Sequence, residues 1–228
     1  LADTVLETDG LTSLREAIAA ANATPEADTI LFAVAGTVAL DPAAGELSVT
    51  APLRIDGAGA LTLDAQGASR VLAVTDAGAG TTLAGLTLAN GNGEGRGEGG
   101  GALWSAAPLT LDTVTIRDSA TSADDAGGGG VRALGDLSLL DSRLEGNATA
   151  GASAKGGAAL AGGDLTLTGG TVADNSTAGA YASGGGLHAG GTLDITGAEI
   201  SANQTAGASA SGGGVSGDGL VTLTGVGL

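Results

Sequence analysis

The sequence predicts an all-β protein: a right-handed parallel β-helix, which is a three-faced solenoid, with a short capping α-helix at its amino end. Alternating aliphatic segments recur with a constant 28-residue period, glycine clusters recur at the same spacing, and a single short segment near the amino terminus has a helical pattern. Equal coils can stack at the ~4.8 Å separation of paired strands, so equivalent side chains become neighbours. About 98% of parallel crossovers are right-handed, and this sets the predicted hand.

The repeat is clearest in residues 99–228, where we expect regular 28-residue coils, each with three short β segments. The middle segment alternates aliphatic and polar residues, so its aliphatic side chains point toward one face. Five copies are in strict register, at 109–111, 137–139, 165–167, 193–195 and 221–223. The sequence stops within a coil, at Leu228, so we expect the natural protein to continue with further repeats.

Glycine and asparagine mark the turns between these segments. Glycine clusters begin at Gly128, Gly156, Gly184 and Gly212, and an earlier cluster at 99–101 lies one residue out of step. Asn147, Asn175 and Asn203 each follow the third segment, where Ser119 holds the equivalent earlier position. Because asparagine tolerates left-handed backbone and bonds nearby backbone groups, we expect a stacked asparagine ladder inside this corner.

The amino-terminal third is organised differently. Ser13 and Glu16 have the spacing of a capping box, and an apolar stripe that begins at Leu14 predicts a helix at about 14–22 within an N-terminal cap of residues 1–27. We expect this helix to cover the open end of the core and to block its exposed strand edge. Residues 28–98 are predicted to form irregular first coils. Short strands are expected at 28–32, 37–40, 47–49, 53–55, 61–63, 71–74 and 83–88, followed by a glycine-rich loop at 91–100.

Composition narrows the possible partners. The formal net charge is −17, and phosphate backbones are bound through Lys and Arg, so we exclude nucleic acid as a partner. No apolar run approaches the ~20 residues that a membrane helix needs, so direct membrane insertion is not expected. The sequence contains no cysteine, which fits an exported protein.

Two motifs resemble those of known families. Residues 9–18 read DGLTSLREAI, and this segment resembles the CSLREA domain near the amino end of secreted bacterial surface proteins, with Thr12 in place of the motif's cysteine. The repeats resemble those of polymorphic outer-membrane-protein adhesins, through the Gly-Gly-Ala-aliphatic run at 156–159 and the aliphatic-x-x-Asn segments at 144–147, 172–175 and 200–203. In that family an aromatic residue stands where this chain has an aliphatic one. The resemblance implies a β-helix from an adhesin or autotransporter-like passenger, located outside the cell or on a bacterial surface.

One outward-facing column contains candidate ligand-binding residues. Trp104, Arg132, Leu160, His188 and Ser216 follow one another at the repeat spacing and would line one exposed face. Trp104 with Arg132 could hold a sugar ring by stacking and hydrogen bonding, although ordinary variation of outward positions is the favoured interpretation. His188 is the single histidine in a chain without cysteine, so it cannot build a metal site with others of its kind.

An enzyme on the same fold is the main alternative, because many polysaccharide lyases, hydrolases and epimerases share this pectin-lyase-like architecture. The candidate acidic and basic residues on the repeat faces are Asp112, Asp118, Asp141, Glu145, Arg117 and Arg143. Arg117 should lie beside Glu145, which we interpret as a surface ion pair. Asp124 and Asp125 could help to hold Ca²⁺, but no calcium-loop motif accompanies them, and no cofactor is expected. The acids do not recur in one column, so we assign no catalytic residue.

The sequence therefore favours a non-catalytic structural and adhesive segment: a rigid β-solenoid stalk that displays loops on an exported bacterial surface protein. Its expected partners are a surface receptor or a polysaccharide. The alternatives are a polysaccharide-active enzyme and a glycan-binding module on the same fold.

Overall fold

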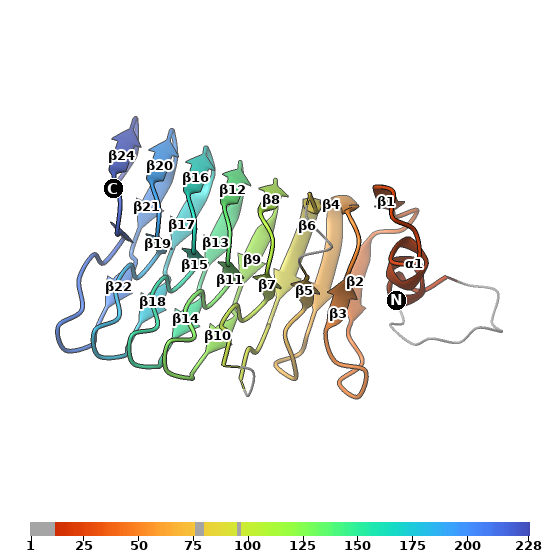
Figure 1. Ribbon diagram of the computed structural model, residues 1–228, viewed down its shortest axis with the longest axis horizontal. Coiled ribbons are helices and arrows are strands. Elements are labelled where there is room, and N and C mark those ends of the chain that lie inside the picture. Colours follow the sequence, from red (N-terminus) through yellow and green to blue (C-terminus); the bar gives the residue numbers. More distant parts are fainter. Residues whose placement is uncertain (1–11, 76–79, 95–96) are drawn as a thin grey trace.

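The computed structural model describes residues 12–75, 80–94 and 97–228. Within these ranges the chain forms one short helix followed by short strands wound into a parallel β-solenoid (Figure 1). The strands lie in sheets of 13, seven and four strands. The predicted parallel β-helix with an amino-terminal helix is confirmed. No helix in this part of the chain is long and apolar enough to cross a membrane.

The seven-stranded sheet forms one face of the solenoid and takes one strand from each coil. Its strands are β3 (Leu47–Val49), β5 (Leu72–Val74), β7 (Leu103–Ser105), β11 (Val131–Ala133), β15 (Ala159–Ala161), β19 (Leu187–Ala189) and β23 (Val215–Gly217). The four-stranded sheet forms another face. It consists of β10 (Ala120–Thr121), β14 (Ala148–Thr149), β18 (Ser176–Thr177) and β22 (Gln204–Thr205).

The 13-stranded sheet contains two sets of repeat strands. The first set is β8 (Leu109–Asp112), β12 (Leu137–Leu140), β16 (Leu165–Thr168), β20 (Leu193–Thr196) and β24 (Val221–Thr224). The second set is β9 (Thr115–Arg117), β13 (Arg143–Glu145), β17 (Thr171–Ala173) and β21 (Glu199–Ser201). The early strands β1 (Asp28–Leu31), β2 (Gly36–Ala39), β4 (Leu53–Asp64) and β6 (Thr82–Ala89) complete it. Because β6 pairs with both β8 and β9, it joins the two sets into one sheet.

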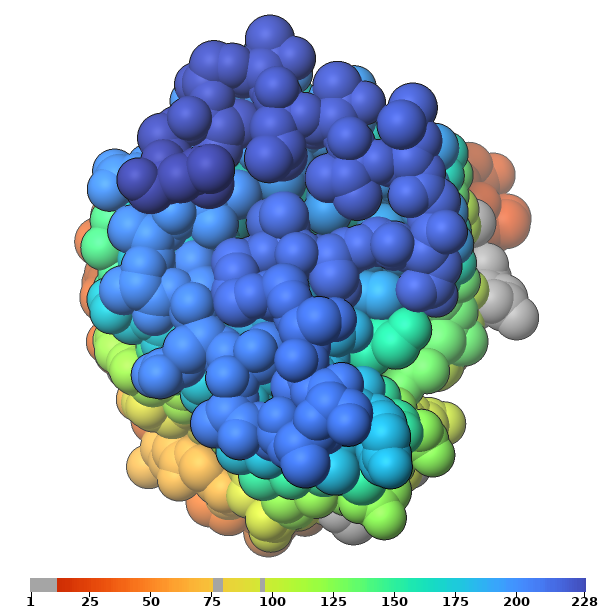
Figure 2. Space-filling model, turned by 90° about the vertical axis from the view of Figure 1, so that its left-hand side faces the viewer, coloured from red at the N-terminus to blue at the C-terminus, as the bar shows by residue number. Residues whose placement is uncertain are grey.

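The predicted register is confirmed. Leu137 pairs with Leu109 on one side and with Leu165 on the other, and all three side chains are buried. The core is built almost entirely from Leu, Ile, Val and Ala, because the interior of each narrow coil is filled by aliphatic side chains from the stacked strands. Figure 2 looks along the stack from the carboxyl-terminal side, and the earlier coils lie behind the last one within a similar outline.

Each regular coil has four strands rather than the three that the sequence predicted. The additional strand, such as β10, has only two residues, which is too short for an alternating pattern to be recognised. In the first coils, the segments predicted at 53–55 and 61–63 belong to one long strand, β4, whose register shifts between Asp56 and Leu61.

Two details of the turns also differ from the prediction. The left-handed backbone lies one residue before each ladder asparagine, at Gly146, Asp174 and Ala202, and at Asp118 before Ser119. The glycine cluster at 99–101 is in step after all, because Gly100 has a φ of 70°, as does Gly128 in the equivalent position of the next coil. Gly100 would place a Cβ 2.3 Å from the Leu103 carbonyl oxygen, so glycine is required there.

The capping helix α1 (Leu14–Ala21) confirms the predicted helix to within one residue at its carboxyl end. The Ser13 hydroxyl accepts a hydrogen bond from the Glu16 backbone at 3.2 Å, and the Glu16 carboxylate accepts one from the Ser13 backbone at 2.7 Å. Leu14 and Ile18 are buried against the first coil, so the helix covers this end of the core. Residues 9–11 of the CSLREA-like motif lie outside the described residues.

Candidate functional site

The structure places the predicted outward column along the seven-stranded sheet. Trp104 pairs with Arg132, and His188 pairs with Ser216. Leu160 lies between Arg132 and His188. Trp104 and Arg132 are therefore direct neighbours, whereas His188 belongs to a separate group two coils away.

Trp104 is packed against a buried cation. The Arg70 guanidinium lies over the indole ring, 5.8 Å from its centroid, and Arg70 is 1% exposed. Glu46 and Glu98 pair with Arg70 at 3.5 and 4.0 Å. Arg70 therefore covers one face of the indole ring, where a sugar could otherwise stack. The sequence analysis missed this contact because Arg70 lies in the irregular coils, outside the regular repeat.

Arg132 is held by a neighbouring loop. Its Nη1 donates a hydrogen bond of 2.9 Å to the backbone carbonyl of Asp125. Partial burial lowers the pKa of the Arg132 guanidinium, while the negative charges of Glu98 and Asp125 act in the opposite direction. Arg132 therefore fixes the loop to the sheet.

His188 is only 3% exposed, so the expectation that it lines an exposed face is wrong. Lys155 and Asp218 cover it: the Lys155 Nζ lies 3.3 Å from Nε2 and Asp218 Oδ2 lies 3.6 Å from it. The Ser216 Oγ lies 2.6 Å from Nδ1 on the other side of the ring. Burial lowers the pKa of His188, and the positive charge of Lys155 lowers it further, against the opposing effect of Asp218.

Four polar residues meet here: Lys155, His188, Ser216 and Asp218. Their types resemble a catalytic group in which Ser216 would be the nucleophile and His188 its base. The His188 Nε2 lies between the Lys155 ammonium, which can only donate, and the Asp218 carboxylate, which can only accept. The other ring nitrogen, Nδ1, lies against Ser216 Oγ. These contacts link neighbouring coils on this face.

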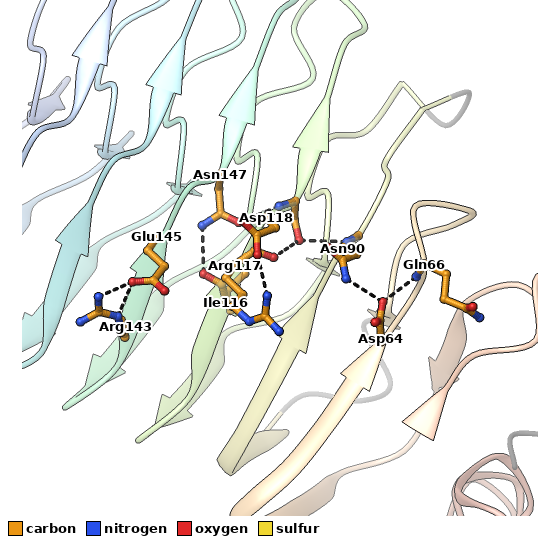
Figure 3. Close-up of polar contacts among 11 residues, drawn as sticks. Asp64, Gln66, Asn90, Ile116, Arg117, Asp118, Arg143, Glu145 and Asn147 are labelled. Carbon is orange, nitrogen blue, oxygen red and sulfur yellow. Dashed lines mark hydrogen bonds and ion pairs between the residues drawn. The ribbon is translucent and has the colours of Figure 1, made fainter. Parts of the chain in front are cut away.

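The acids and bases considered for catalysis form local ion pairs. Arg117 pairs with Asp118 at 2.6 Å, and Arg143 pairs with Glu145 (Figure 3). Arg117 does lie beside Glu145, as predicted, since the two residues are strand partners on adjacent coils. Each forms its ion pair within its own coil, however, so the predicted Arg117–Glu145 ion pair is wrong.

The two residues considered for Ca²⁺ lie in the loop before β11. Asp124 Oδ1 accepts a hydrogen bond of 2.8 Å from the Ala152 backbone of the next coil, and the Asp125 carbonyl accepts from Arg132. Among the described residues, no group of three or more His, Cys, Asp or Glu side chains is placed to hold a metal ion.

The asparagine ladder predicted from the sequence is confirmed. Asn147 Nδ2 donates to Asn175 Oδ1 at 3.0 Å, and Asn175 Nδ2 donates to Asn203 Oδ1 at 2.9 Å. Ser119 extends the column, because its backbone N–H donates to Asn147 Oδ1 and its hydroxyl accepts from the Gly91 backbone. The ladder fixes the turn before the four-stranded sheet at the same geometry in each coil.

Outside this ladder lies a groove of about 570 Å³, which we call the corner groove. Its polar lining residues are Gln66, Asn90, Asn92, Glu94, Asp118 and Ser122. Small residues, Ala120, Ala148 and Ala150, also line it. The volume is within the range of ~300–1,000 Å³ that is typical of small-molecule sites.

Successive coils supply the polar residues of the groove. Figure 3 shows Gln66, Asn90 and Asp118 following one another along the stack. Asn90 and Asp118 have left-handed backbone, with φ of 53° and 54°. The sequence does contain one indication of this groove, because Asn90 and Asp118 are separated by one repeat period. The glycine-rich stretch around Glu94 indicates only a loop.

Comparisons with known proteins provide no assignment for this site. No protein-family model, no curated protein and no solved structure matches the chain.

Proposed function

We propose that this chain is a non-catalytic structural and adhesive segment of an exported bacterial surface protein. In this role it is a rigid stalk that displays its loops to a surface receptor or polysaccharide. The observation that carries the proposal is the stacking of coils in unbroken register from β7 to β24, where equivalent residues pair on the seven-stranded and 13-stranded sheets. Such a stack bonds each coil to its neighbours and resists bending.

The distribution of variable residues supports the same role. Inward positions repeat aliphatic residues, and the asparagine ladder repeats one amide. Outward positions differ from coil to coil, as at Trp104 and Arg132 on the seven-stranded sheet. A stalk needs a constant interior and tolerates, or uses, a varied surface.

Particle attachment tests the proposal. Beads coated with the folded chain should be retained under flow on polysaccharide films or on protein-coated matrices, whereas beads coated with heat-unfolded chain should wash off. The same films should release no new reducing ends or unsaturated products. If the beads attach to none of the surfaces, the adhesive role is contradicted. Reproducible bond cleavage contradicts a non-catalytic role.

A glycan-binding module is the second candidate, and the direct pairing of Trp104 with Arg132 favours it. It is expected to lose affinity for the bound sugar in Trp104→Ala while circular dichroism is unchanged. Equal affinity of Trp104→Ala and the wild type would rule out this face as the binding site.

A further inference from the structure

The side-chain amides of the corner groove are held in place by hydrogen bonds within the protein. Gln66 Nε2 donates to Leu40 O at 2.8 Å, Asn90 Nδ2 to Asp64 Oδ1 at 2.9 Å, and Asn92 Nδ2 to Gly67 O at 3.1 Å. Each of these bonds uses one of the two N–H donors of its amide, so each amide keeps one donor for a ligand. The Ser122 hydroxyl donates to Glu94 Oε1 at 2.8 Å.

Acceptors remain. Within the described part of the chain, no donor reaches Gln66 Oε1, Asn90 Oδ1, Glu94 Oε2 or Asp118 Oδ1. These oxygens come from three consecutive coils, and Asn90 and Glu94 belong to the same coil. A ligand that contacts all of them must span three coils and must carry hydrogen-bond donors.

Charge restricts the ligand further. Glu94 and Asp118 are both carboxylates, and Arg117 is paired with Asp118 at 2.6 Å. An acidic polymer such as a polyuronate would bring like charges into the groove. Hydroxyl groups, in contrast, form the stronger charge-assisted type of hydrogen bond with carboxylates.

We propose that the corner groove binds an uncharged saccharide chain, with sugar hydroxyls donating to Gln66, Asn90, Glu94 and Asp118. The proposal rests on the adhesive function proposed above and names the chemical class of its surface ligand. The alanines of the groove leave room for sugar rings, since Ala150 is exposed and Ala148 half-buried.

A glycan array tests the ligand class. It carries neutral oligosaccharides of glucose, galactose, mannose and N-acetylglucosamine, together with deacetylated chitosan oligomers and oligogalacturonates. We expect binding to at least one neutral oligosaccharide and none to oligogalacturonates. Binding restricted to oligogalacturonates, binding restricted to chitosan oligomers, or no binding at all overturns the proposal.

The repeat provides a matched pair of variants that locate the site. Ala150→Trp fills the groove, and Ala178→Trp places the same side chain at the equivalent exposed position one coil later, outside the lining. Ala150→Trp should weaken binding of the neutral oligosaccharide at least about tenfold, equal to ~1.4 kcal/mol, and Ala178→Trp should bind as the wild type does. Circular dichroism checks that both fold. Equal binding by the two variants overturns the location.

A double variant separates hydroxyl recognition from attraction of amino groups. Glu94→Gln with Asp118→Asn keeps an acceptor at each position and removes both charges. Neutral oligosaccharides should bind about three- to tenfold more weakly because neutral hydrogen bonds replace charge-assisted ones. Unchanged binding of neutral oligosaccharides contradicts recognition through these carboxylates. If the array is negative while coated beads still attach to surfaces, the groove proposal fails and the adhesive function stands.

Discussion

Asn147 donates a side-chain hydrogen bond of 3.0 Å to Oδ1 of Asn175, the equivalent residue of the next coil. The same oxygen accepts the backbone N–H of Asn147 at 2.9 Å, so one side chain satisfies two donors of the preceding coil. Asn175 Nδ2 in turn donates to the carbonyls of Leu144 and Ala173. This amide therefore connects consecutive coils through both its oxygen and its nitrogen.

Asn175→Ala should be strongly destabilising, because it leaves buried backbone groups of two coils without partners. Each unsatisfied buried group costs about 1–3 kcal/mol, so we expect a loss of at least ~2 kcal/mol in the free energy of unfolding. Urea denaturation followed by circular dichroism measures it. Ser176→Ala, at the adjacent outward-facing position, is the control and should change stability by less than about 0.5 kcal/mol. A similar small effect in both variants would contradict the structural role of the ladder.

Gly157→Ala tests the close approach of coils at the glycine clusters. A Cβ at Gly157 would lie 2.1 Å from the Gly185 carbonyl oxygen and 2.5 Å from that of Ser176, so the backbone must shift. We expect a loss of about 1–3 kcal/mol or more in urea denaturation. Gly197→Ala is the control, because its φ of 65° is left-handed but its Cβ meets nothing within 4 Å. In this control, the free energy of unfolding should fall only by the ~1–2 kcal/mol that a left-handed backbone costs a residue with a Cβ. A smaller loss for Gly157→Ala would refute the steric argument.

The coil architecture was predictable because it depends on spacing alone. Equivalent residues such as Leu109 and Leu137 occupy the same place in successive repeats, and equal spacing leaves stacking as the arrangement that pairs them. The cap was predictable for a different reason: Ser13 and Glu16 satisfy each other locally, without any knowledge of the fold.

The sites were less predictable because they depend on side chains that cross between coils. Lys155 buries His188 by reaching over from another coil, and no column of the repeat contains both residues. Arg70 covers Trp104 from a coil whose length differs from that of the regular repeat. The corner groove is lined partly by Gln66 of an irregular early coil and partly by residues of the regular coils. The 28-residue period alone could therefore not reveal the groove.

Ser13→Ala should weaken the capping helix. The hydroxyl accepts the Glu16 backbone N–H, and its loss leaves a donor at the start of the helix unsatisfied. We expect the stability of the helix to fall by about 0.5–2 kcal/mol, which should appear as faster amide hydrogen exchange in the first turn of α1. Exchange in β16 should be unaffected, because the strands that α1 packs against are β1 and β3 of the first coils. Unchanged exchange in α1 would show that the capping box contributes nothing.

The free energy of unfolding should fall as the pH decreases below about 6.5, the ordinary pKa of histidine. Burial lowers the pKa of His188 in the folded chain and Lys155 lowers it further, with Asp218 opposing, so the unfolded chain takes up this proton first. The dependence extends from 6.5 down to the lowered folded pKa. The carboxyl groups with lowered pKa, Asp56, Asp164 and Asp218, lose their contribution only from about 3.8 downward.

Urea denaturation between pH 7 and pH 5 isolates this effect, since His188 is the only histidine in the sequence. His188→Gln should flatten the dependence in this range. Lys155→Met removes the neighbouring positive charge, raises the pKa of His188 and should therefore give a shallower slope than the wild type. Asp218→Asn removes the opposing negative charge and should steepen it. A slope that is the same in His188→Gln and the wild type would mean that another group titrates.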